Sequence, residues 1–166
     1  FSEIFENGRW IAEGAYNLEL GPSHNTAIGL HNALCRIFRS ARYETRKKLV
    51  EAHSGGHQKP VIFEKLISEE NKDIARTLDE QFSAKFGFKY ALSETDANNC
   101  DVLQNLRERL ESDYMTEFAE NCRQIEILEQ VCLSRVHLHL RRPVYFRMIL
   151  QLIPLAIPQL RFVEMR

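Results

Sequence analysis

Apolar residues recur at intervals of three and four along most of the chain, which is the spacing of amphipathic α-helices. Four of them, separated by four residues each, predict one buried helical face: Ile74, Leu78, Phe82 and Phe86. Gly87 follows directly, at the position where many helices end on a left-handed residue and where glycine avoids the steric cost of a Cβ. The pattern therefore predicts a buried helix that ends at Gly87.

Beyond Gly87 the pattern changes to a period of two. Phe88, Tyr90 and Leu92 alternate with Lys89 and Ala91, which predicts a short extended segment. Backbone N–H groups in such a segment have no helical partner and must pair with another segment, with water or with a ligand. Two interpretations stay open here: a structural end to the helix, or a row of main-chain donors for a ligand.

Helical spacing predicts several further helices. Their apolar residues are Trp10, Ile11 and Ala15; Leu30, Leu34, Ile37, Phe38 and Ala41; Leu103, Leu106 and Leu110; and Met115, Phe118, Cys122, Ile125, Leu128 and Cys132. A shorter helix with basic residues is expected from Tyr43 to Ala52. Ser23 or Asn25, Ser68, and Asp113 are candidate N-caps. With about seven helices and almost no sheet, the sequence predicts an all-α, single-domain bundle.

Composition narrows the class of protein. The chain has 166 residues, enough for one domain with a sizeable core, and a net charge of −1, which gives no electrostatic case for nucleic acid or an anionic membrane. The four cysteines form no Cys-x-x-Cys pair, and Cys35, Cys122 and Cys132 lie on apolar helical positions. Buried free thiols in a reducing compartment are expected, and these cysteines are poor candidates for nucleophiles.

The C-terminal part fits the helical pattern poorly. Met148 to Leu160 carries no charge but is 13 residues long and contains two prolines, whereas a membrane-spanning helix needs about 20 apolar residues. We expect a helical domain over residues 1–140 and an apolar, proline-containing tail over 141–166, packed on the bundle or across a subunit interface. No membrane span is predicted.

Histidines are the main candidates for chemistry, since no phosphate loop, zinc pair or nucleophile elbow is present. His53 and His57 bracket a glycine turn, but two histidines rarely hold a metal without a third ligand, so no metal site is predicted. His53 ends a helix and opens a loop, and histidine is the residue type that most often serves as a general acid or base. An ordinary loop histidine is the alternative.

Basic residues gather near the end of the long helix, at Arg135, His137 and His139. Cations near a helix C-terminus are favoured by the helix dipole, so a structural role is the default interpretation. Arg135 lies about 200° around the helix from His137, so the two cannot simply replace each other.

Four pieces of the chain occur in an order that resembles one family. They are Phe5–Glu13, Ala52–His53, the Phe82–Phe88 stretch with Lys-Phe-Gly-Phe, and the final long helix. Together they are similar to the OHCU decarboxylases, the 2-oxo-4-hydroxy-4-carboxy-5-ureidoimidazoline decarboxylases of urate degradation. The resemblance covers roughly residues 1–140.

This resemblance implies an all-α fold, usually a homodimer, and cofactor-free loss of CO₂ from a small ureidoimidazoline substrate to give (S)-allantoin. The family's catalytic histidine, in a His-Pro-Asp/Glu-Leu motif, corresponds to His53. The catalytic candidates are His53, His137 and Arg135. The expected substrate-binding residues are Ser54, Phe88, Tyr90, Ala91, Leu92 and Ser93, whose backbone N–H groups could hold an oxyanion as CO₂ departs.

The chain departs from the family pattern at two places. Ser54-Gly55-Gly56 replaces the residues after the histidine, and the segment that follows lacks the family's Ser-x-x-Glu-Gln motif. The family arginine near the end of the long helix falls on His137, which is neither permanently charged nor bidentate.

Three functions remain open on the sequence. The first is a divergent decarboxylase, in the cytoplasm or the peroxisome. The second is a catalytically inactive relative that binds a ligand or a partner. The third is a helical interaction module unrelated to purine breakdown, because a fold does not determine a function.

Overall fold

The computed structural model describes residues 5, 8–18, 24, 26–53 and 65–139, and the side chains at 132 and 135–139 are outside the description. Three of the predicted features therefore lie outside the described residues: the caps at Ser23 and Asn25, the Ser54–His57 turn, and the tail 141–166.

The described residues form seven α-helices and one 3-10 helix, and none of them is in a strand. The helices are α1 (Arg9–Tyr16), α2 (Ala27–Ser40), α3 (Tyr43–Ala52), α5 (Lys72–Phe86), α6 (Glu94–Ala97), α7 (Val102–Glu111) and α8 (Tyr114–His139), with η2 (Glu69–Asn71) as the 3-10 helix. The predicted all-α, single-domain bundle is confirmed.

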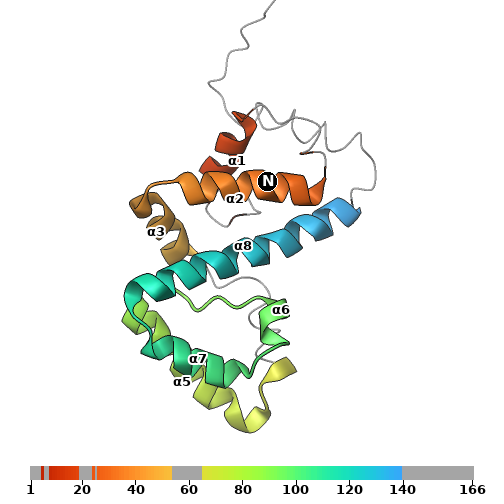
Figure 1. Ribbon diagram of the computed structural model, residues 1–166. Helices are drawn as coiled ribbons and strands as arrows, with labels where there is room; N and C mark the ends of the chain where they lie inside the picture. Colours follow the sequence, from red (N-terminus) through yellow and green to blue (C-terminus); the bar gives the residue numbers. More distant parts are fainter. Residues whose placement is uncertain (1–4, 6–7, 19–23, 25, 54–64, 140–166) are drawn as a thin grey trace, which may run out of the picture.

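The long helix α8 runs through the middle of the molecule (Figure 1). On one side of it α2 packs along α8, α1 packs on α2, and α3 packs on α8. On the other side α5 and α7 pack on each other. Residues 88–93, drawn in green between α5 and α6, form the extended segment that returns toward α8.

Short-range capping sets where several helices begin. Thr26 caps α2: its Oγ1 accepts a hydrogen bond from the Gly29 N–H at 3.0 Å. Asp113 caps α8 as predicted, since its Oδ1 accepts from the backbone N–H groups of the second and third residues after it at 2.9 and 3.0 Å. Ser68 precedes η2 and makes no side-chain cap hydrogen bond there.

Two residues predicted to be buried are exposed. Ile74 is 42% exposed and Met115 is 58% exposed. On a helix of 3.6 residues per turn, four-residue steps drift by about 40°, so Ile74 lies about 120° around α5 from Phe86, whereas Ala75 lies only about 20° from it. Ala75 is accordingly the buried residue in this turn. Met115 lies in the first turn of α8, before its buried stripe begins.

An aromatic cluster fills the space between α5, the extended segment and the start of α8. Its buried or half-buried members are Phe82, Phe86, Phe88, Tyr90, Tyr114 and Phe118. Their ring centroids are separated by 4.7 to 6.3 Å, within the range of favourable aromatic pairs. Gly87 makes the turn between the two halves of this cluster, with a φ of 77°.

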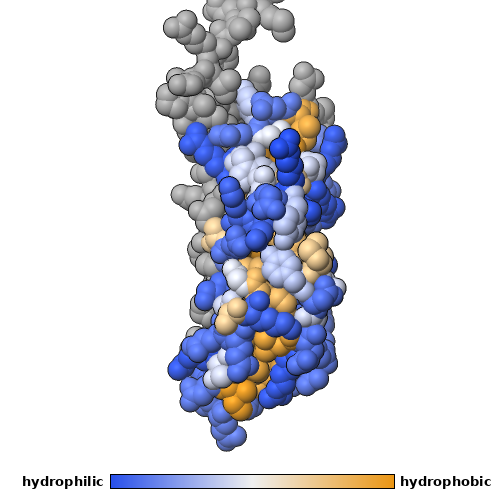
Figure 2. All heavy atoms as spheres, turned by 90° about the vertical axis from the view of Figure 1, so that its left-hand side faces the viewer, coloured by the Kyte–Doolittle hydropathy of each residue, from blue (hydrophilic) through white to orange (hydrophobic). Residues whose placement is uncertain are grey.

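The side of the molecule at the left of Figure 1 is mostly hydrophilic, with a band of hydrophobic atoms in its lower half, at the height of α5 and α7 (Figure 2). Within the described residues, no helix combines the length and the apolar character needed to cross a bilayer.

Gly87 offers a direct test of the turn. A Cβ at this position would meet no atom within 4 Å, so a substitution changes only the backbone conformational energy. We expect Gly87→Ala to lower the free energy of unfolding by about 1–2 kcal/mol, because an L-residue is strained in the left-handed region. Gly87→Asn should lose less, since asparagine tolerates this region better. Urea denaturation measures both variants, and an alanine variant as stable as the wild type would contradict this account.

Candidate active site

His53 lies at the junction of α3 and the segment that follows it. It is the C-cap residue of α3, with an extended backbone, and its N–H donates to the Val50 carbonyl at 3.3 Å. The side chain is buried, 2% exposed, and its Nε2 lies 3.5 Å from Oε1 of Glu129 on α8, whose side chain is 6% exposed. The surface loop histidine considered from the sequence is therefore a buried histidine facing a buried carboxylate.

The turn of α8 that carries Glu129 is fixed by two side chains of α2. His31 Nε2 donates to the Glu126 carbonyl oxygen at 2.8 Å. Arg39 binds the Glu126 carboxylate through two nitrogens, Nε at 2.9 Å and Nη2 at 2.5 Å. A bidentate arginine–carboxylate pair restricts the orientation of both groups. This turn of α8 therefore has a defined position relative to α2.

Cys35 lies beside His31, with Sγ 3.2 Å from Nε2 of that histidine. Burial, together with the nearby Glu126 carboxylate, raises the pKa of the Cys35 thiol to about 12. Burial likewise raises the pKa of Cys122 to about 11. Since the thiolate is the reactive form, neither of these cysteines is suited to nucleophilic chemistry.

The extended segment 88–93 is held by polar side chains of α8. Asn121 Oδ1 accepts from the Ala91 N–H at 3.0 Å, and its Nδ2 donates to the Lys89 carbonyl at 3.0 Å. Gln124 Oε1 accepts from the Ser93 N–H at 2.7 Å. Of the partners left open from the sequence, the Ala91 and Ser93 N–H groups therefore use another segment of the chain. The helix supplies side-chain amides where a neighbouring strand would supply backbone groups.

Arg109 of α7 completes this arrangement. Its Nη1 donates to the Ala91 carbonyl at 2.7 Å, and its Nε donates to Oε1 of Glu117 at 2.8 Å. The guanidinium carbon lies 4.5 Å from the centre of the Tyr90 ring, a favourable cation–π distance. Burial raises the pKa of the Glu117 carboxyl, and the charge of Arg109 opposes this effect.

Both regions contact α8, but on different faces. His53 meets the helix at Glu129, and the extended segment meets it at Asn121 and Gln124. Gln124 and Glu129 are five residues apart, which corresponds to a rise of about 7.5 Å and a rotation of about 140° around the axis. The His53 ring and the Ser93 N–H are thus directed to separate sides of the helix.

The remaining predicted site residues divide into three groups. Phe88, Tyr90 and Leu92 are buried in the core, and the Tyr90 hydroxyl donates to Asn105 Oδ1 at 2.7 Å. Arg135 and His137 lie on α8 six and eight residues beyond Glu129, a rise of about 9 and 12 Å, and their side chains are outside the described part. Ser54 lies outside the described residues.

Sequence reasoning missed the polar residues of α8. Glu117, Asn121, Gln124, Glu126 and Glu129 are all buried. The first three follow the spacing i, i+4 and i+7, so they share one face of the helix beside the apolar stripe. Helical spacing of polar residues next to a buried stripe was the available signal, but a solvated face gives the same signal.

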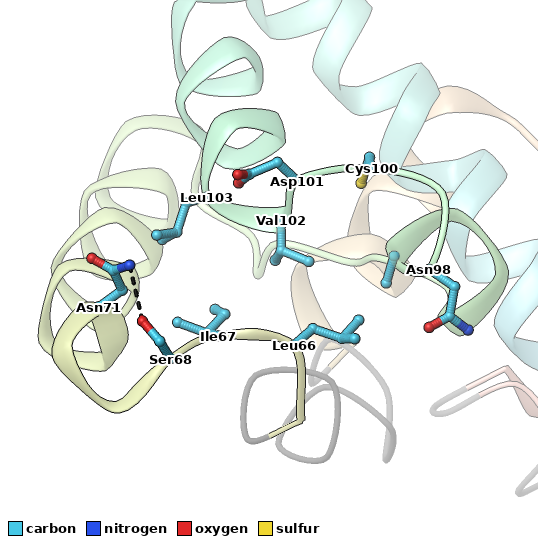
Figure 3. Close-up of a pocket in the computed structure, with 10 residues that line it drawn as sticks. Leu66, Ile67, Ser68, Asn71, Asn98, Cys100, Asp101, Val102 and Leu103 are labelled. Carbon is cyan, nitrogen blue, oxygen red and sulfur yellow. Dashed lines mark hydrogen bonds between the residues drawn. The ribbon is translucent and has the colours of Figure 1, made fainter.

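A separate pocket of about 350 Å³ lies between η2 and the start of α7 (Figure 3). Ile67 and Val102 point toward one another across it, and Asn71 donates to the Ser68 hydroxyl at 3.1 Å on its rim. It shares no lining residue with the His53–Glu129 pair. Within the described residues, no three or more acidic, histidine or cysteine side chains are grouped so as to hold a metal ion.

The fold and site define an all-α bundle in which one long helix carries most of the buried polar groups. The family model of the OHCU decarboxylases matches residues 1–136. The chain belongs to the OHCU decarboxylase family, a family of carbon–carbon lyases.

The chain is similar to a bacterial protein of urate degradation and to a solved structure. The uric acid degradation bifunctional protein PucL of Bacillus subtilis (strain 168) is 27% identical over 128 residues, which is 70% of this chain and 25% of PucL. The chain thus spans about a quarter of that relative. The crystal structure of an (S)-allantoin synthase matches with a TM-score of 0.63 and 17% identity, over 81% of this chain and 47% of that one. At this identity the structural match supports the fold alone.

The Arg109–Glu117 pair predicts a large stability effect. Arg109→Met leaves the Glu117 carboxylate buried without its partner, and we expect a loss of about 3–5 kcal/mol in the free energy of unfolding. Arg76→Met is the control, because Arg76 and its partner Asp73 are both largely exposed and such pairs contribute less than about 1 kcal/mol. Chemical denaturation measures both. Equal losses in the two variants would show that the buried pair has no special role.

Proposed function

We propose that this protein decarboxylates 2-oxo-4-hydroxy-4-carboxy-5-ureidoimidazoline to (S)-allantoin in urate degradation, without a cofactor. Family membership supports the reaction class, and the relative named for uric acid degradation supports the pathway. The structural observation that carries the proposal is the buried His53 side chain, 3.5 Å from the Glu129 carboxylate. A buried imidazole beside a carboxylate is a group suited to moving protons.

The reaction needs one bond cleavage and one proton relocation. The bond between the ring carbon and its carboxylate breaks, CO₂ leaves, and the electron pair passes into the conjugated ring. The hydroxyl on that carbon loses its proton as a carbonyl forms, and the neighbouring carbon that bears the ureido group gains one. Because the carboxylate leaves as neutral CO₂, the ring nitrogen that receives its electron pair takes up one proton from water. The net change is the loss of CO₂ and the gain of one proton, so the balance requires no oxidant or reductant.

His53 is the residue to which we assign the proton relocation. A neutral imidazole can accept the hydroxyl proton and, once protonated, can return a proton to the ring carbon. Delivery from one fixed side would give a single enantiomer of allantoin. The amides of Ala91 and Ser93 are not part of this proposal as oxyanion donors, because Asn121 and Gln124 already accept their hydrogen bonds.

Other parts of the proposal rest on the resemblance. Catalytic roles for Arg135 and His137, and substrate contacts from the residues expected around the extended segment, stay predictions. So do a homodimer and a location in the cytoplasm or peroxisome. They are independent of the His53 assignment and do not affect its test.

The activity test uses freshly generated substrate, with allantoin formation followed by absorbance and its handedness by circular dichroism. We expect the protein to accelerate the decarboxylation of the substrate and to give the (S) enantiomer of allantoin. His53→Asn should lower kcat by about 10²–10⁴-fold, the range usually contributed by general acid–base catalysis. Lys48→Ala, an exposed change on the same helix, should leave kcat unchanged. Racemic product at the spontaneous rate would rule out the decarboxylase. Full turnover by His53→Asn would rule out the assignment of His53.

A catalytically inactive, ligand-binding relative is the second candidate. It is favoured by the two amides of the extended segment that α8 side chains already occupy. Here we expect (S)-allantoin to raise the midpoint of thermal unfolding in a concentration-dependent way, because a ligand of the native state stabilises it by mass action, about 2.7 kcal/mol at 100 times Kd. A protein with no turnover and no thermal shift at saturating allantoin would contradict both candidates.

A further inference from the structure

The carboxylate that faces His53 comes from a part of the chain to which no role has been assigned. Glu129 lies 76 residues after His53, on α8, and approaches it with Oε1 at 3.5 Å from Nε2. Both side chains are buried, so the approach is not a fluctuating surface contact. A hydrogen bond of ordinary length between the two atoms needs a shift of about 0.5 Å.

We infer that Glu129 is the positioning residue of His53, holding the imidazole in the tautomer with its proton on Nε2. A carboxylate has only acceptor oxygens, so it favours the tautomer whose N–H points toward it. Nδ1 then carries the lone pair. The carboxylate thereby sets the ring orientation and the tautomer together, as in other histidines oriented by a carboxylate.

Contacts with α2 also hold the turn of α8 that carries Glu129. One turn earlier on the same helix, the Glu126 carbonyl accepts from His31, and the Glu126 carboxylate binds Arg39. These bonds attach the turn to α2, while His53 is attached to α3 by its backbone N–H. The two members of the pair are therefore held by different helices. The pair depends on the packing of α2, α3 and α8 together.

Only the expected effect of Glu129 on turnover rests on the proposed function. The tautomer of His53 can be read without any activity, from the nitrogen chemical shifts of ¹⁵N-labelled histidine at alkaline pH, where histidine is ordinarily neutral. The His53 signals are assigned by their loss in His53→Asn. The failure of the decarboxylase proposal and the failure of the positioning proposal are thereby separate results.

Glu129→Gln is the test variant because glutamine has nearly the same size as glutamate, but it is uncharged and can donate a hydrogen bond as well as accept one. An amide both donates and accepts, so it can pair with either tautomer. We expect the Nε2–H form to predominate in the wild type and the ratio of the two tautomers to fall at least about threefold in Glu129→Gln, which corresponds to about 0.65 kcal/mol. If the protein turns over substrate, kcat should fall about 10–100-fold with KM nearly unchanged, as for other residues that orient a catalytic group.

Glu120→Gln is the matched control, an identical change nine residues earlier on the same helix, about 13.5 Å away along its axis. The Glu120 carboxylate binds Arg123 on the outer side of the helix and contacts neither His53 nor the α2 side chains that hold the Glu129 turn, so the His53 tautomer should be unchanged in this variant. Glu129→Leu provides a second variant that removes the acceptor altogether. An unaltered His53 tautomer in a folded Glu129→Gln or Glu129→Leu protein overturns the inference. Equal tautomer shifts in Glu120→Gln and Glu129→Gln also overturn it, because the effect would then reflect a general disturbance of α8.

Discussion

The need to satisfy buried backbone polar groups shapes the centre of this protein. After Gly87 the chain leaves α5 as an extended segment that runs through the core, with residues 90–93 all buried. Extended backbone in a core normally pairs with another strand. Here side chains of α8 and α7 take that role, through Asn121, Gln124 and Arg109. The long helix is therefore polar on a buried face, and the bundle assembles around that face.

The same helix is the support of the candidate site. One face holds the extended segment, and another presents Glu129 to His53. Because α2 and α3 also pack on α8, the histidine, its carboxylate and the residues that fix the carboxylate are contributed by three elements. A mutation that loosens the packing of α2 on α8 would therefore affect the site without touching it.

The sequence predicted the elements well where the signal was local. The helix ending at Gly87, the cap at Asp113 and the length of α8 follow from spacing and residue type. Ile74 is exposed although a four-residue spacing links it to Phe86, because each four-residue step rotates the position by about 40° around the helix. The cap of α2 fell on Thr26 because several capping residues stand close together before it, and only the folded geometry selects one.

The site was less predictable. The resemblance of the chain to a family, together with the position of His53 at a helix end, made this histidine a candidate. Glu129 was not a candidate, because it lies far along the chain and a glutamate on a helix is usually solvated. The partners of the backbone N–H groups after Gly87 were left open from the sequence for a related reason. Asn121 and Gln124 give no local sign that their side chains turn inward, because their partners are backbone groups of a distant segment.

Helical geometry gives this arrangement a sensitivity to register. Each residue inserted or deleted in an α-helix rotates everything beyond it by about 100°. One such change between Gln124 and Glu129 would leave the amides that hold the extended segment in place, yet would turn the carboxylate away from the imidazole. Related chains in which this spacing differs by a single residue would thus retain the fold and lose the pair.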